Sequence, residues 1–137
     1  MQEGSGRPAT LLALLLATAA LSGCTAAPQN TSAGDFKGAE ADVAKAIDDL
    51  KGSRNPDEIC KDYLTQAFAR SLAADGRDCQ DEVEAMMRDI AATDLDVKRV
   101  TISGSNAQAE VRQDGKTATF ELERGSGGWQ ISSFGSA

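Results

Sequence analysis

The chain has 137 residues, and its 14 Lys and Arg against 21 Asp and Glu give a formal net charge of −7. Acids outnumber bases by 15 to 8 between positions 35 and 94, and no basic stripe is present, which argues against nucleic acid and against electrostatic docking on anionic lipid. A solvated helix surface is the simpler interpretation of the acid excess. The length suits one domain with a hydrophobic core but not two.

The first motif is an apolar run from Leu11 to Leu21, shorter than the ~20 residues that a stable bilayer-crossing helix needs. It has the length of the hydrophobic region of an export signal. The run ends in Leu21-Ser-Gly-Cys24, where a bulky aliphatic residue and two small residues precede a Cys. This ending resembles the lipobox of bacterial lipoproteins, in which a peptidase cuts before the Cys and the thiol receives a diacylglyceryl group.

The lipobox resemblance implies a signal peptide over 1–23, a lipid-anchored flexible tether over 24–38 and a single domain over 39–137. Acylation of Cys24 with two chains would give stable anchoring, at roughly 0.8 kcal/mol per buried methylene. The expected location is the extracytoplasmic face of the cell membrane, with the membrane as a partner through Cys24. The alternatives are a simple secretory signal with a Cys after it by chance, and an uncleaved anchor helix.

Two further cysteines, Cys60 and Cys79, form an even pair for an oxidising compartment. A disulfide closing this loop of about 20 residues would stabilise the fold by roughly 3 kcal/mol. The alternatives are a metal pair or a catalytic thiol. Because the chain has no His, a Cys–His dyad is impossible and zinc would need two carboxylates. We therefore favour the disulfide and expect no metal site and no cofactor.

Three amphipathic helices are predicted ahead of residue 95. The first covers 39–51, with apolar residues at three- and four-residue spacing (Val43, Ala46, Ile47, Leu50), and Gly52 ends it. The second starts with Asn55 as N-cap and Pro56 at its first position, and Asp75-Gly76 closes it. Its apolar face contains Ile59, Cys60, Tyr63, Leu64, Ala67, Phe68 and Leu72. The third follows Asp78, with a buried stripe of Val83, Met86, Met87 and Ile90.

The expected disulfide constrains the second helix. If this helix ran unbroken to Ala74, its ends would lie about 20 Å apart at 1.5 Å per residue. Bridged α-carbons lie within about 7 Å of each other. The second helix should therefore stop near Phe68 to Leu72, and the chain should return as a loop to Asp78.

From Leu95 onward the hydrophobic period changes to two, which predicts strands. Turn signals at Gly104-Ser105-Asn106, Asp114-Gly115 and 125–128 separate four strands, and the last runs from Trp129 to Phe134. One face of this antiparallel meander is apolar, so the three helices should cover it. The predicted fold class is α+β, with three N-terminal helices packed on a curved four-stranded antiparallel meander.

Helices followed by a meander with a final Gly-Gly-Trp-Gln-Ile strand resemble the nuclear transport factor 2-like superfamily, in which a curved sheet wraps around helices. More narrowly, residues 39–134 resemble small actinobacterial lipoproteins of that superfamily, with a lipobox, a Cys pair across the second and third helices and a terminal Gly-Gly-Trp strand. The resemblance implies a cone that often leaves a pocket between sheet and helices. Some members are enzymes, such as ketosteroid isomerase, and others are binding or accessory modules, so the fold does not choose between them.

Candidate residues for lining such a pocket are Tyr63, Phe68, Met86, Met87, Phe120 and Trp129. Ordinary packing is the simpler role for each of them, and the hydroxyl of the sole Tyr would then lie at the edge of the core. The superfamily enzymes use a buried Asp or His as base, often with a Tyr hydroxyl as oxyanion donor. Here His is absent, and the strand acids Glu110, Glu121 and Glu123 fall on the polar phase, so we expect no catalytic residue.

The sequence predicts a non-catalytic binding or interaction domain, with an envelope protein or an apolar small molecule as its partner. One alternative is a small lyase or isomerase, which needs an acid or Tyr63 pointing into a cavity with a perturbed pKa. The other is a structural surface module, whose core is filled by Phe68, Met86, Phe120 and Trp129. Nothing in the pattern indicates an oligomeric state.

Overall fold

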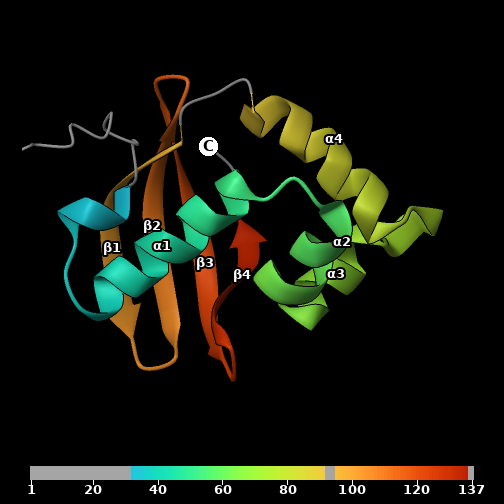
Figure 1. The fold of residues 1–137 in the computed structure, drawn as a ribbon. Helices are drawn as coiled ribbons and strands as arrows, with labels where there is room; N and C mark the ends of the chain where they lie inside the picture. Colours follow the sequence, from blue (N-terminus) through green and yellow to red (C-terminus); the bar gives the residue numbers. More distant parts are fainter. Residues whose placement is uncertain (1–31, 92–94, 136–137) are drawn as a thin grey trace, which may run out of the picture.

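A computed structural model describes residues 32–91 and 95–135, with four α-helices preceding a four-stranded antiparallel sheet (Figure 1). The α+β class is therefore confirmed. The signal segment, Cys24 and the first part of the expected tether lie outside the described residues. Among the residues described, none of the helices has both the length and the apolar run that crossing a membrane requires.

The described chain begins with a single 3₁₀ turn, η1 (Ser32–Asp35), that packs on the domain. Ala33 and Phe36 lie half-buried against the core, and the Ala33 backbone N–H donates to the Asp48 carboxylate at 3.0 Å. We expected the whole of 24–38 to be a flexible tether. Within this predicted tether, η1 and Phe36 contact the helical layer through apolar side chains and a hydrogen bond.

Helix α1 (Ala39–Gly52) agrees with the prediction at both ends. Val43, Ile47 and Leu50 are buried beneath it, as the three- and four-residue spacing requires. Next, Asn55 caps α2 (Pro56–Glu58) by accepting a hydrogen bond from the Asp57 backbone N–H at 3.1 Å. The predicted capping signal is thus confirmed.

The second predicted helix is broken into pieces. A π-helical turn, η2 (Ile59–Tyr63), extends α2, and then Leu64 turns to an extended conformation with φ −99° and ψ 148°. There the chain pairs with the sheet: Leu64 bridges Ile131 in parallel, and the Thr65 backbone N–H donates to the Ile131 carbonyl at 2.9 Å. Thr65 then caps a new helix, α3 (Gln66–Leu72), through its hydroxyl.

The chain therefore turns twice between the bridged cysteines. It breaks at Leu64, which was not predicted, and the helix after this break ends at Leu72, within the predicted range of Phe68 to Leu72. A second reversal follows in the 3₁₀ turn η3 (Ala74–Gly76), where Asp75 and Gly76 both have positive φ. We also predicted one apolar face that would include Ala67. That prediction is wrong for Ala67, which is exposed.

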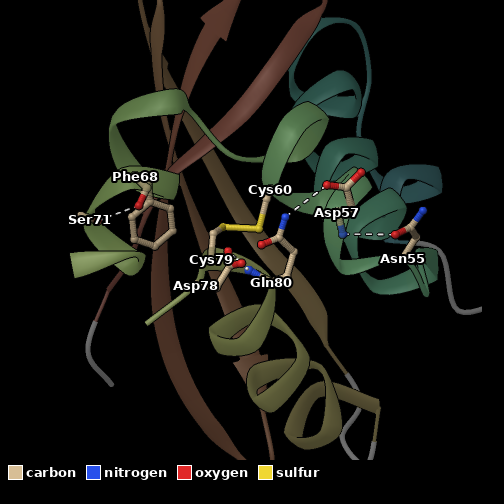
Figure 2. The surroundings of a disulfide bond; sticks show 8 residues. All are labelled: Asn55, Asp57, Cys60, Phe68, Ser71, Asp78, Cys79 and Gln80. Carbon is tan, nitrogen blue, oxygen red and sulfur yellow. Dashed lines mark hydrogen bonds between the residues drawn. A yellow bond between two sulfur atoms is a disulfide. The ribbon is translucent and has the colours of Figure 1, made fainter. Parts of the chain in front are cut away.

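Cys60 of η2 and Cys79 at the start of α4 (Cys79–Ala91) form the predicted disulfide, with their α-carbons 6.3 Å apart (Figure 2). Asp78 caps α4 by accepting from the Gln80 backbone N–H at 3.3 Å. Beside the bridge, the Gln80 side-chain amide donates to the Asp57 carboxylate at 3.2 Å. These contacts fasten the start of α4 to α2 and η2.

The sheet is a meander in the order β1 (Asp96–Ser103), β2 (Asn106–Gln113), β3 (Lys116–Gly125) and β4 (Gly128–Phe134). The alternation is as predicted, since Ala109, Val111 and Leu122 are buried. Asp114 and Gly115 both have positive φ, which the tight hairpin turn between β2 and β3 requires.

Helix α1 lies over one face of this sheet, whereas α2, α3 and α4 lie beside its β4 side, so the predicted covering of the face by all the helices is met by α1 (Figure 1). Helix α1 lies across the strands, and α3 packs beside β4, while α4 packs on α2, α3 and η2. The predicted stripe of α4 is buried at Val83 and half-buried at Met86 and Met87, whereas the side chain of Ile90 lies outside what is described. The core is centred on Ile47, Ile59, Leu64, Leu122 and Ile131.

Candidate functional site

The space between α3 and the end of the sheet is filled by three phenylalanines. Phe134 packs edge-on against Phe68 and Phe120, with ring centroids 5.2 Å and 4.9 Å apart. Phe120 is only 4% exposed. Two of the expected pocket residues, Phe68 and Phe120, therefore contribute to solid packing around Phe134. The sequence predicted Phe134 only as the end of the last strand.

Met86 and Met87 border a small apolar cavity between α4, the end of α1 and the end of β4. Its volume is about 10 Å³, which is room for about one water molecule. The cavity is therefore closed to a small-molecule ligand in this conformation. We call it the apolar cavity; its lining is Leu50, Lys51, Arg54, Ile59, Val83, Met86, Met87 and Phe134.

The other two expected pocket residues, Tyr63 and Trp129, lie in an open groove of about 630 Å³, which we call the Tyr63 groove. This volume is within the range of about 300–1,000 Å³ that is typical of ligand sites. Residues of α1 form one wall: Asp42, Lys45, Ala46 and Asp49. The opposite wall comes from α2, η2 and the β3–β4 turn: Glu58, Asp62, Tyr63, Arg124, Gly125, Gly127, Gly128 and Trp129.

One stripe of α1 and one long-range hydrogen bond place these walls. Asp42, Lys45 and Asp49 are spaced at three and seven residues, so they project from one stripe of α1. The Gln130 side-chain amide donates to the Asp62 backbone carbonyl at 3.1 Å and so holds η2 against β4. Beyond Tyr63, a second hollow of about 630 Å³ shares Asp49, Glu58 and Tyr63 with the groove and continues toward Asn55.

The Tyr63 hydroxyl lies among negative charges. It donates to the Glu58 carboxylate at 3.5 Å, and the Ser53 hydroxyl donates to the other oxygen of Glu58 at 3.2 Å. Burial, followed by the charges of Glu58 and Asp49, raises the pKa of Tyr63 above its usual 10.0. The phenol is therefore neutral at physiological pH, with its proton directed to a carboxylate.

The cations of the groove are already engaged. Lys45 forms a salt bridge with Asp49 at 2.5 Å, and this contact raises the pKa of Lys45 above 10.5. The guanidinium of Arg124 lies over the Trp129 ring, 4.7 Å from its centroid. By contrast, no salt bridge within 4 Å engages Asp42, Glu58 or Asp62 among the described residues.

Trp129 is 7% exposed and is one of the residues that line the Tyr63 groove. Its Nε1–H is buried and has no hydrogen-bond acceptor in the described part of the chain. An indole N–H in a protein interior ordinarily has a partner. With essentially no exposed surface, this donor is an unsatisfied polar group of the interior and is not exposed in the open groove.

The strand acids follow the predicted phase. Glu121 and Glu123 are exposed on the outer face of the sheet, while Leu122 between them is buried. Within residues 32–91 and 95–135, no group of three or more His, Cys, Asp or Glu is arranged to hold a metal ion. What the groove offers chemically is hydrogen bonding and negative charge around an aromatic residue.

Sequence reasoning missed the α1 wall and Arg124. Asp42, Lys45 and Asp49 carry a signal, since they share one helical stripe, but polar stripes of this kind usually face solvent. Comparison of this chain with protein-family models, with curated proteins and with solved structures found no match. The interpretation of the site accordingly depends on its own geometry.

Proposed function

We propose that this chain is a lipoprotein anchored through Cys24 to the extracytoplasmic face of the cell membrane, with a non-catalytic binding domain. The observation that carries the binding role is the open Tyr63 groove, which combines hydrogen-bonding groups with the edge of an aromatic core. The meander with preceding helices supports a nuclear transport factor 2-like cone as the finer description of the fold.

The proposed location is supported by two independent features. The sequence Leu21-Ser-Gly-Cys24 has the pattern of a lipobox. The Cys60–Cys79 disulfide is of the kind that persists in oxidising compartments and is rare in the cytosol of mesophiles. Together they favour an exported domain displayed by a lipid on its N-terminal Cys.

Geometry argues against the lyase or isomerase alternative. An oxyanion donor must direct its hydrogen at the position of the developing charge. The Tyr63 hydroxyl directs its hydrogen at Glu58 instead, and the groove around both is open to solvent. The packing of Phe68, Phe120 and Phe134 favours a second candidate function, a structural surface module, because it leaves little interior room for a ligand.

Replacement of the acylated thiol tests the anchor. In the expressing bacterium, we expect Cys24→Ala to move the protein into the soluble fraction and to abolish labelling by a fatty-acid analogue, because no thiol remains to be acylated. Ser22→Ala is the matched control, since it retains a small residue at the same motif and should preserve membrane retention. Membrane retention of Cys24→Ala equal to that of the unchanged protein would contradict the proposed anchor.

A further inference from the structure

We draw no further inference here: the strongest candidate, the apolar cavity between α4, the end of α1 and the end of β4, has room for about one water molecule, and nothing in the described structure shows what ligand would open it.

Discussion

The apolar cavity and the Tyr63 groove differ although the same turn, η2, contributes to both. The apolar cavity uses Ile59 of η2, which is 1% exposed, and it is nearly filled by methionine and phenylalanine side chains. The Tyr63 groove uses the last residue of the same turn, and it is wide, polar and open. The domain thus leaves little room between α4, α1 and β4, whereas two large hollows lie open at the surface of the described structure, one where α1 meets the β3–β4 turn and one where α1 meets α2.

The largest expected effect on the free energy of unfolding comes from the packed phenylalanines. We expect Phe120→Ala to lower the free energy of unfolding by about 3–5 kcal/mol, because it removes a buried ring and leaves a cavity beside Phe134. Urea unfolding of the mature protein measures this loss.

The matched substitution on the groove side is Asp62→Asn. Because Asp62 is exposed and its carboxylate forms no salt bridge in the described structure, unfolding should change by no more than about 0.5 kcal/mol. If Phe120→Ala lowered the free energy of unfolding as little as Asp62→Asn does, the interior would not be tightly packed. The contrast between the packed interior and the Tyr63 groove would then be wrong.

The disulfide should come next, because it fixes the turn that both hollows share. Cys60 and Cys79 are 19 positions apart, and removing the bridge by Cys60→Ala with Cys79→Ala should cost about 3 kcal/mol on the chain-entropy model. The same unfolding measurement applies, with the emission of Trp129 as a separate reading of the groove. Loss of stability with unchanged Trp129 emission would show that the groove keeps its shape without the bridge.

Much of the fold followed from local sequence rules. The spacing of Val43, Ile47 and Leu50 predicted α1, and Asn55 with Pro56 predicted the start of α2. Alternation and the Asp114-Gly115 turn predicted the sheet. Each of these signals acts within one element or between adjacent ones, so a single sequence contains it.

The break at Leu64 could not be found in this way. Leu64 fits the apolar stripe of a helix. Its backbone is extended instead because this part of the chain pairs with Ile131, far along the sequence. The Cys60–Cys79 constraint correctly required the chain to double back, but it limited only the distance between the two ends. Where the chain turned was decided by a long-range backbone contact.

The groove was beyond prediction for a similar reason. Its walls come from α1, η2 and the β3–β4 turn, and only the assembled fold brings Asp42 near Arg124 and Trp129. Of the expected pocket residues, Tyr63 and Trp129 line this groove, Met86 and Met87 border the apolar cavity, and Phe68 and Phe120 pack around Phe134. Apolar character alone could not separate these three environments.

The smallest expected effect concerns Tyr63, at the boundary between the two regions. Tyr63→Phe removes the hydrogen bond to Glu58 and should cost no more than about 1 kcal/mol below pH 10, since the groove is open to solvent. Because the folded-state pKa of Tyr63 is raised by burial and by Glu58, ionisation disfavours the folded state. The stability due to the hydroxyl is therefore fully present below the unfolded pKa of about 10 and is lost as the pH rises through the folded value.

The difference in unfolding free energy between the unchanged protein and Tyr63→Phe should accordingly shrink above pH 10. Because Tyr63 is the only Tyr, the alkaline change in tyrosine absorbance reports this one group, and its midpoint should lie above that of the unfolded protein. A midpoint at or below the unfolded value would mean that neither burial nor the charges of Glu58 and Asp49 act on the phenol, which would contradict the surroundings described for Tyr63.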